Sequence, residues 1–172
     1  MKTAVILPTG DEIRSGIVLD TDSPEVMAQL IRMEPELAVS RWSPVEDEEE
    51  IICRAVKAAA ETADLVVLIG GSGGGHRYSE TLSRDFTHTA LDTLLQPCVS
   101  RRLFGKNGHL WCRLVCGRLG DTLVINLPGP FVEAQAAMAA FCKMADTNDL
   151  DAINLAMTEA VKAQYPTGAE VR

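Results

Sequence analysis

A glycine-rich segment contains the residues whose types most directly suggest chemistry. Residues 65–69 read LVVLI and lead into six residues, five of them glycine, which His76 and Arg77 follow. Consecutive glycines allow positive φ and let backbone N–H groups approach an anion, and basic side chains can add charge-assisted hydrogen bonds. The segment is not a P-loop, because no Gly-Lys-Ser/Thr closes it, and His76 replaces the third glycine of a dinucleotide fingerprint. We predict phosphate binding by Gly70, Gly71, Ser72, Gly73, Gly74, Gly75, His76 and Arg77, with a surface loop that binds nothing as the alternative.

Two other loops carry polar groups directly after apolar runs. The sequence PTGDEIRSGIVLDTDS at residues 8–23 is dense in carboxylates and hydroxyls, and NLPGP at 126–130 forms a rigid turn with an available amide at Gly129. The alternatives are that residues 20–23 cap a helix and that the prolines end a strand. The predicted ligand contacts from these loops are Thr9, Gly10, Glu12, Ser15, Asp20, Ser23, Pro128 and Gly129.

The elements that must position these loops alternate between strand and helix. Repeated βα units predict an α/β fold of three layers, αβα, with a mostly parallel sheet, and a tight turn at 118–121 adds one antiparallel strand. Ligands of such folds bind beyond the carboxyl ends of the strands, so the three loops are expected to meet. The expected strands are 3–7, 37–42, 65–69, 110–116 and 122–127, and the expected helices are 23–33, 47–62, 131–144 and 149–164, with 81–95 partly helical.

Composition limits the class of protein. The 172 residues are 47% hydrophobic, which suits one domain, expected at 1–165 and followed by a frayed tail at 166–172. The net charge of −8 argues against nucleic-acid or anionic-membrane partners. Five cysteines, an odd number without zinc-ligand spacing, suggest reduced thiols in a cytoplasmic protein. The short apolar start reads as a strand and not as a signal peptide or a membrane span.

Four segments together resemble the molybdopterin-binding (MoaB/Mog-like) domain family of molybdenum cofactor biosynthesis, which includes molybdopterin adenylyltransferases and the third domain of molybdopterin molybdotransferases. The segments are TGDEIRSGIVLDTDS, VEDEEEII, ADLVVLIGGSGGG and LVCGRLGDTLVINLPGPFVEA, at residues 9–23, 45–52, 63–75 and 114–134. They occur in the family's order within residues 3–141. The N-terminal domain of competence-damage-inducible proteins is a close relative of this family.

The resemblance implies a pocket for molybdopterin, as ligand or substrate, and in adenylyltransferase members transfer of AMP from Mg-ATP to the molybdopterin phosphate. VEDEEEII places Asp47 on the family's aspartate, which makes it a predicted Mg²⁺ ligand, and the predicted catalytic residues are Asp47 and Asp11. The alternatives are structural: Asp47 would simply be one of the solvated acids at the start of a helix, and Asp11 would form a turn or cap a helix. The resemblance also implies a homo-oligomer, a dimer or a trimer.

Two departures from the family pattern leave other functions open. Tyr78 stands where the family usually carries an acid after the glycines, although Glu80 or Asp85 could replace it. Molybdotransferases carry a lysine just before the closing hairpin. The corresponding stretch here, residues 110–113, ends at Arg113 and contains no lysine, although Lys106 lies nearby. One alternative is therefore a catalytically degenerate pterin-binding, nucleotide-binding or regulatory module. Another is a nucleotide pyrophosphate hydrolase like the competence-damage-inducible relatives.

Overall fold

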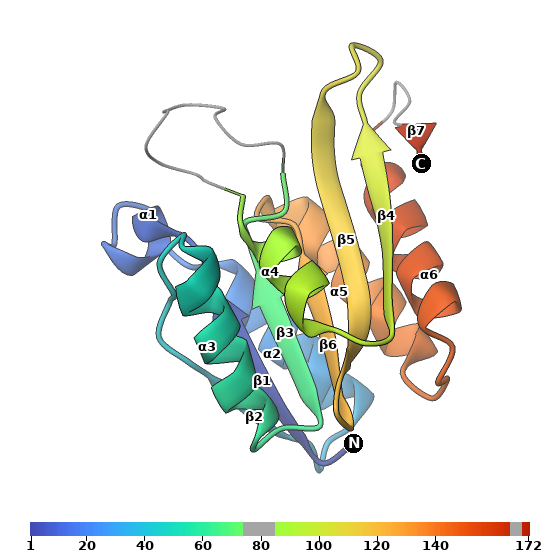
Figure 1. The fold of residues 1–172 in the computed structure, drawn as a ribbon. Coiled ribbons are helices and arrows are strands. Elements are labelled where there is room, and N and C mark those ends of the chain that lie inside the picture. The colour runs from blue at the N-terminus through green and yellow to red at the C-terminus, as the bar shows by residue number, and fades with distance from the viewer. Residues whose placement is uncertain (74–84, 166–169) are drawn as a thin grey trace.

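The computed structural model describes residues 1–73, 85–165 and 170–172, and its centre is one mixed β-sheet (Figure 1). In this part of the chain the sheet has seven strands in the order β2-β1-β3-β6-β5-β4-β7. The first four of these strands run parallel to one another. The strands in chain order are β1 (Thr3–Pro8), β2 (Ala38–Arg41), β3 (Leu65–Ile69), β4 (Cys98–Phe104), β5 (Leu110–Leu119), β6 (Thr122–Leu127) and β7 (Glu170–Val171).

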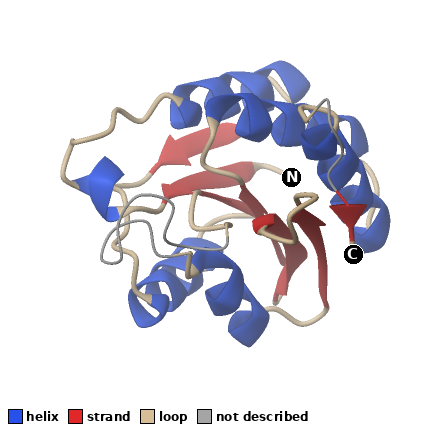
Figure 2. Ribbon diagram, turned by 90° about the horizontal axis from the view of Figure 1, so that it is seen from above, coloured by secondary structure: helices blue, strands red, loops and turns tan. Residues whose placement is uncertain are grey.

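Helices cover both faces of the sheet, as the view from above shows (Figure 2). The helices are α1 (Asp11–Arg14), α2 (Asp22–Met33), α3 (Glu49–Ala60), α4 (Thr87–Leu94), α5 (Phe131–Met144) and α6 (Leu150–Lys162). Helices α2, α5 and α6 share one apolar core with the sheet, whereas α3 and α4 share a second core on its other face. The predicted three-layer α/β fold is confirmed. No helix in the described residues is long and apolar enough to cross a membrane.

The alternation of side chains along the central strands explains the two cores. Along β1, Ala4 and Ile6 face the first core, while Val5 and Leu7 face the second. Strand β3 is buried along its whole length, which is why its sequence is a continuous apolar run. Such strands are easy to recognise in the sequence, and they hold the loops that follow them at one edge of the sheet.

The antiparallel part of the sheet extends further than the sequence predicted. Strand β5 runs antiparallel to β6, as expected, but β4 then pairs antiparallel with β5, and β7 with β4. The charged pair Arg101 and Arg102 obscured β4, because both side chains lie on a half-buried strand near the edge of the sheet. The tail was expected to be frayed from 166, yet its residues Glu170 and Val171 pair with β4.

Two helix starts differ from the expected positions, and both differences affect the candidate site. Helix α2 begins at Asp22, and Ser23 is not its N-cap; the Ser23 amide instead donates to Asp20 Oδ1 at 3.0 Å. Helix α3 begins at Glu49, so Asp47 precedes the helix and does not lie within it. The ambiguous segment 81–95 contains α4, whose first turn lies beside the glycine-rich loop.

Candidate functional site

The three predicted loops meet at the carboxyl ends of β1, β3 and β6, where they line a cavity of about 330 Å³. The start of α5 and the side chains of Asp47, Asp85 and Trp111 complete its wall. The parallel order of β1, β3 and β6 places the ends of these strands at one edge of the sheet. The cavity therefore lies where ligands of open α/β folds usually bind.

Most of the predicted site residues that the structure describes line this cavity. Ser15 and Ser23 do not: Ser15 is exposed and donates to the Asp11 and Glu12 carbonyls, while Ser23 is buried. Asp11 does not line the cavity either. Gly74, Gly75, His76 and Arg77 lie outside the described residues, as do Tyr78 and Glu80. The lining residues among those predicted are Thr9, Gly10, Glu12, Asp20, Asp47, Gly70, Gly71, Ser72, Gly73, Pro128 and Gly129.

Two glycines at the start of the glycine-rich loop occupy positions that side chains could not share. Gly70 has φ of +101°, and a Cβ there would lie 2.7 Å from the Thr9 carbonyl oxygen. Gly71 has φ of +59°, and a Cβ there would lie 2.3 Å from Thr87 Oγ1. Both the backbone conformation and the close packing require glycine. The bare backbone at these positions thus lets the loop pass close to β1 and α4.

The backbone amides of this loop are arranged to receive a ligand. The Gly71 carbonyl accepts a hydrogen bond from the Thr87 amide at 3.1 Å, and the Ser72 carbonyl accepts one from the Arg113 amide at 2.7 Å. Because a trans peptide is planar, the Ser72 N–H points away from the Gly71 carbonyl and therefore away from α4. Within the described residues, the amides of Ser72 and Gly129 make no hydrogen bond. Such amides are suitable donors for a phosphate.

The acidic side of the cavity is organised around Asp47, which is 4% exposed. The Asp11 amide donates to Asp47 Oδ2 at 3.2 Å, and the Asp47 amide donates to Asp11 Oδ1 at 3.3 Å. Asp47 Oδ1 and Glu12 Oε2 are buried without a hydrogen-bond partner in the described part of the chain. Burial, with the charges of Glu12, Asp11 and Asp85 nearby, raises the pKa of Asp47 to about 7 despite the hydrogen bond from the Asp11 amide. The site therefore favours a cation beside these oxygens.

Sequence reasoning did not assign all the acids of the cavity. Asp85, which was considered only as a substitute, accepts from the Gly73 amide at 2.9 Å and lies close enough to raise the pKa of Asp47. Asp22 lines the cavity too, and burial together with the Asp20 charge raises its pKa to about 6. Asp20 is also partly buried, but hydrogen bonds from Ser23 and Arg41 hold its pKa below the usual value. The spacing of these acids along the chain carries no sign that they share a cavity.

The acids suit a metal ion that arrives with a ligand better than a resident one. No group of three or more His, Cys, Asp or Glu side chains within the described ranges is placed to hold a metal. Mg²⁺ commonly takes one or two carboxylates and completes its shell with phosphate oxygens and water. The unpartnered oxygens of Asp47 and Glu12 fit that pattern. Lys106, which was considered as a displaced lysine, is exposed in the turn between β4 and β5 and does not line the cavity.

The mouth of the cavity is apolar and suits a ring. Leu19 and Val18 are 81% and 47% exposed, and Phe131 at the start of α5 is 42% exposed. All three line the cavity, and Trp111 lies in its wall with its ring centroid 4.2 Å from that of Tyr165. Exposed apolar side chains beside buried acids and bare amides indicate a ligand that is flat at one end and anionic at the other.

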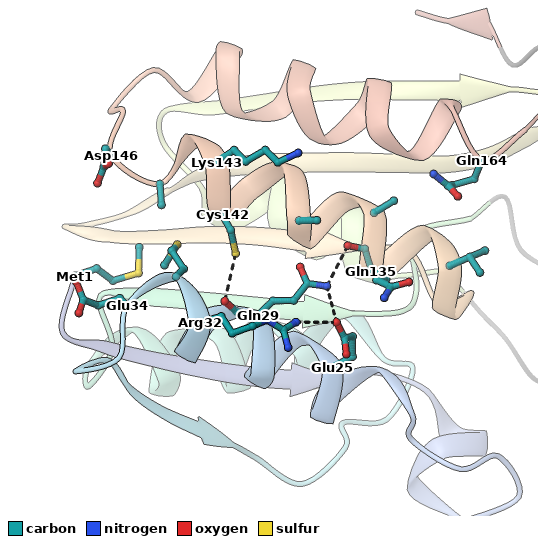
Figure 3. A pocket seen from close by; sticks show the side chains of 15 residues that line it. Met1, Glu25, Gln29, Arg32, Glu34, Gln135, Cys142, Lys143, Asp146 and Gln164 are labelled. Carbon is teal, nitrogen blue, oxygen red and sulfur yellow. Dashed lines mark hydrogen bonds and ion pairs between the residues drawn. The ribbon is translucent and has the colours of Figure 1, made fainter.

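A second and larger cavity, of about 910 Å³, lies between α2 and α5 and contains none of the predicted site residues (Figure 3). Its polar side chains pair mainly with one another: Gln29 Nε2 donates to Glu25 Oε1 at 3.0 Å and to the Gln135 carbonyl at 3.3 Å. Arg32 donates to the same Glu25 oxygen at 3.1 Å. The bond from Gln29 to the Gln135 carbonyl joins the two helices and the others lie within α2, so these side chains serve the packing of helices and we keep the candidate site at the strand ends.

Comparison with known families identifies the family of the chain. The family described as "probable molybdopterin binding domain" matches residues 5–147, which include every described residue of the candidate site. The chain belongs to this family. The resemblance stated from four sequence segments is therefore confirmed. Membership in a molybdopterin-binding family points to a pterin as the small-molecule partner.

Several solved structures share the fold of this chain. The molybdopterin biosynthesis enzyme MoaB from Thermus thermophilus superposes with a TM-score of 0.68 at 23% identity, over 92% of this chain and 98% of that protein. MogA gives a TM-score of 0.67 at 20% identity, over 88% and 99% of the two chains. A CinA protein from Thermoplasma acidophilum gives 0.57 at 20% identity, over 93% and 98%. At these identities the likeness concerns the fold.

Curated relatives match a shorter part of the chain. A CinA-like protein from Pseudothermotoga lettingae is 40% identical over 73 residues, which is 42% of this chain and 18% of that protein. One from Anaeromyxobacter dehalogenans is 41% identical over 68 residues, which is 40% of this chain and 16% of that protein. The chain thus matches less than a fifth of the length of these curated relatives.

Proposed function

We propose that this molybdopterin-binding family domain binds molybdopterin in the cavity at the strand ends and transfers AMP from Mg-ATP to the molybdopterin phosphate. In this reaction a phosphate oxygen of the pterin forms a bond to the α-phosphorus of ATP. The bond from that phosphorus to the oxygen bridging to the β-phosphate breaks, and pyrophosphate leaves. The pterin phosphate is already ionised at neutral pH, so its attack needs no general base.

One observation carries this proposal: Asp47 and Glu12, each with a buried carboxylate oxygen that has no partner among the described residues, line the same cavity as Ser72 and Gly129, whose amides make no hydrogen bond there. A cavity with acids alone would repel phosphates, and one with amides alone would give a metal ion no ligand. A phosphate that carries Mg²⁺ satisfies both halves. This combination favours a magnesium–phosphate substrate over a neutral ligand.

Each residue then has a defined part. The amides of Ser72 and Gly129 hold phosphate oxygens, and Phe131 with Leu19 packs against a ring at the mouth. Asp47 and Glu12 hold the Mg²⁺ of Mg-ATP, which neutralises charge that develops between the phosphates. Asp11 positions Asp47 through their two reciprocal hydrogen bonds, a different role from the catalytic one that the sequence suggested. Asp85 takes the place of the acid that the family usually carries at the position of Tyr78.

The test is incubation of the protein with molybdopterin and Mg-ATP, followed by separate assays for bound pterin and adenylated pterin. We expect adenylated product from the natural chain and a loss of about a hundredfold or more in Asp47→Asn, because one ligand of the ion is removed. Glu48→Gln is the matched control, since Glu48 is an exposed acid one residue away. Pterin binding without product would instead indicate the degenerate binding module.

A second candidate function is hydrolysis of a nucleotide pyrophosphate. The match to a CinA-like protein, 40% identical over 73 residues, favours it. The resemblance to competence-damage-inducible proteins suggests the same reaction from the sequence. The same carboxylates would then hold the metal while water replaces the pterin phosphate as the attacking group. Release of AMP from a dinucleotide or a nucleotide sugar without added pterin would support this alternative. We also propose that the protein acts in the cytoplasm, in keeping with its five free cysteines.

A further inference from the structure

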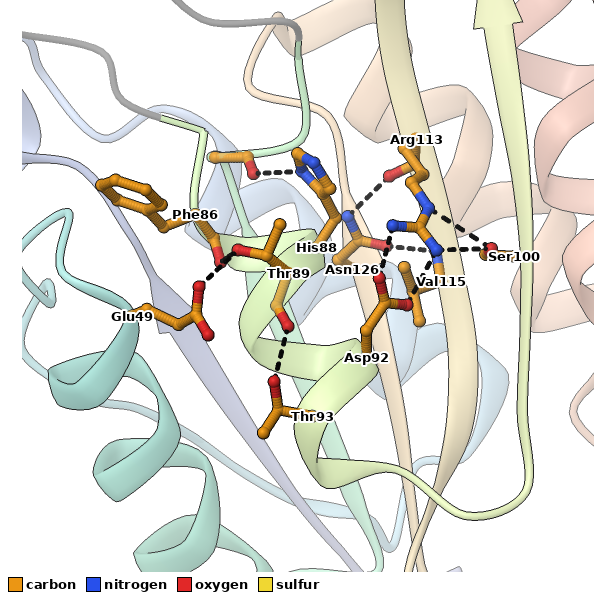
Figure 4. Close-up of polar contacts among 11 residues, drawn as sticks. Glu49, Phe86, His88, Thr89, Asp92, Thr93, Ser100, Arg113, Val115 and Asn126 are labelled. Atoms are coloured by element: carbon orange, nitrogen blue, oxygen red, sulfur yellow. Dashed lines mark hydrogen bonds and ion pairs between the residues drawn. The ribbon is translucent and has the colours of Figure 1, made fainter.

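The glycine-rich loop packs against a network of polar contacts among α4, β4, β5 and β6, which the proposed reaction does not use (Figure 4). This network begins where two neighbouring strands separate. The pairing of β5 with β6 runs from Leu119 and Thr122 to Cys116 and Ile125, and it stops there. The loop after β3 reaches over this gap, since its Ser72 carbonyl accepts from the Arg113 amide on β5.

Asn126, which is fully buried, replaces the missing strand-to-strand bonds in the gap. Its Oδ1 accepts from the Val115 amide at 2.6 Å, and its Nδ2 donates to the Arg113 carbonyl at 3.0 Å. The main chain at Arg113 is thus held from both sides: its carbonyl by β6 and its amide by the glycine-rich loop.

The Arg113 side chain ties the same point to two further elements. The guanidinium forms a bidentate ion pair with Asp92 of α4, with Nη2 2.8 Å from Oδ1, and donates to Ser100 Oγ of β4 at 2.9 Å. The Arg113 side chain is 12% exposed and that of Asp92 is 39% exposed, so the arginine end of the pair is the shielded one. The ion pair therefore joins α4 firmly to β5.

Helix α4 in turn holds the residue before Ser72. The Gly71 carbonyl accepts from the Thr87 amide at 3.1 Å and lies 3.3 Å from His88 Nδ1. Burial lowers the pKa of His88 despite this contact. Because a carbonyl oxygen can only accept, the contact is a hydrogen bond in the tautomer that carries its hydrogen on Nδ1. Helix α4 and β5 thus hold the carbonyls of two successive residues, Gly71 and Ser72.

We propose that Arg113 and Asp92 are positioning residues for the phosphate-binding loop. Their ion pair fixes α4 against β5, and these two elements fix the carbonyls of Gly71 and Ser72. Peptide planarity then fixes the direction of the Ser72 N–H. This inference rests on the proposed function for the ligand, but the ordering of the loop is independent of it.

The chain offers a matched control for this ion pair. Arg101 of β4 forms an ion pair with Asp151 of α6, in which its Nη2 lies 2.9 Å from each carboxylate oxygen, and its side chain is 19% exposed. That pair joins the same sheet to another helix and does not touch the loop. Arg113→Lys and Arg101→Lys each keep the charge and remove the guanidinium that makes these contacts.

The first measurement is hydrogen exchange of the two amides that hold the loop, read by NMR on the full chain without ligand: the Thr87 amide, which donates to the Gly71 carbonyl, and the amide of residue 113, which donates to the Ser72 carbonyl. We expect at least about tenfold faster exchange of these two amides in Arg113→Lys and no change in Arg101→Lys. Asp92→Asn is the second variant: it leaves the Arg113–Ser100 bond in place and should give a smaller effect in the same direction. Unchanged exchange in both Arg113→Lys and Asp92→Asn, or equal acceleration in the Arg101 variant, would overturn the inference.

The second measurement compares the affinity for molybdopterin with the affinity for its dephosphorylated form. Arg113→Lys should weaken binding of the phosphorylated pterin by about tenfold or more and leave the dephosphorylated form nearly unchanged. Equal weakening of both forms would contradict a role in positioning the phosphate. If the natural chain binds neither form, the proposed function fails, and the hydrogen exchange result still decides whether Arg113 orders the loop.

Discussion

At the scale of single residues, the candidate site depends on the protonation of one buried acid. Asp47 is almost completely buried, and its pKa of about 7 places its ionisation near physiological pH. Burial is the main cause, and three neighbouring carboxylates add to it. A carboxyl in this state is only partly ionised near pH 7 when the cavity is empty, and a bound cation favours its ionised form.

Binding of Mg²⁺ with a phosphate ligand should therefore strengthen as the pH rises from 6 to 8. The ion competes with the proton on Asp47, and the fraction of ionised Asp47 increases through its pKa of about 7. Titration calorimetry with Mg-ATP at several pH values measures this. Asp47→Asn, read in parallel, separates the titration of the protein from that of the nucleotide. A natural chain and an Asn variant with the same pH profile would contradict this role of Asp47.

The same acid affects the stability of the ligand-free protein. The folded state keeps the Asp47 proton up to about pH 7, whereas the unfolded chain loses it near 3.8. Between these values the folded state binds more protons, so raising the pH lowers the free energy of unfolding. Asp47→Asn should raise the Tm at pH 8 by about 2–10 °C, because a buried group without compensation costs about 1–3 kcal/mol.

That thermal measurement has an internal control, because the two proteins should differ much less at pH 4. An Asn variant less stable than the natural chain at pH 8 would mean that neighbouring groups already offset the cost of burying the ionised Asp47 carboxylate.

At the scale of elements, the site depends on how closely the glycine-rich loop packs against α4. Thr87, in the first turn of α4, is fully buried, and its Oγ1 lies 3.0 Å from the Oγ1 of Thr9. Its position leaves no room for a side chain on Gly71. The start of α4 thus connects the ends of β1 and β3 before any ligand binds.

Gly71→Ala should destabilise the protein by more than a positive φ alone explains. Gly108→Ala is the control, because Gly108 also has a positive φ, +75°, but its Cβ would meet nothing within 4 Å. We expect a loss of about 1 kcal/mol for Gly108→Ala and at least about twice that for Gly71→Ala, measured by urea unfolding. Equal losses would show that the loop shifts easily away from Thr87.

Asn126→Ala tests the gap between β5 and β6. The change leaves the Val115 amide and the Arg113 carbonyl unpaired in the interior, which should lower the free energy of unfolding by about 2–4 kcal/mol. Asn148→Ala removes an amide that is exposed and bonded to Arg118 at 3.1 Å, and it should cost less than about 0.5 kcal/mol. A small effect at Asn126 would mean that water enters the gap.

At the scale of the whole molecule, the last residues complete the sheet. Val171 pairs with Leu103 and Glu170 with Phe104, and the Arg172 guanidinium lies 5.2 Å from the centre of the Phe104 ring. Deleting residues 166–172 should leave the fold intact and lower the Tm by about 2–4 °C, because a short edge strand contributes about 1 kcal/mol. Circular dichroism on heating measures this. An unchanged Tm would favour the frayed tail and the 1–165 domain that the sequence suggested.

The oligomeric state remains a prediction that belongs to the same scale. The sequence resemblance implied a dimer or a trimer, and light scattering with size-exclusion chromatography on the full chain would measure the mass directly. A mass of two or three times 18.6 kDa would agree with that expectation, and a monomer would contradict it.

The residues of the chain by themselves determined the fold class, and they brought the three loops of the candidate site to one edge of the sheet. Apolar runs such as LVVLI reveal strands buried on both faces, and the loops that follow such strands in an α/β fold share one edge of the sheet. These are properties of short segments, so they can be recognised without knowing the neighbours. The same reasoning missed β4 and β7, because edge strands with charged side chains lack a clear pattern.

Tertiary structure alone decided which acids act together and what holds the glycine-rich loop. Asp47 and Asp85 are 38 positions apart in the sequence, yet their charges interact, and the Arg113 amide donates to the carbonyl of Ser72, 41 positions before it. The raised pKa of Asp47 and the direction of the Ser72 amide arise from burial and from contacts between distant segments. No local pattern encodes such properties, because they depend on the sum of all neighbours in space.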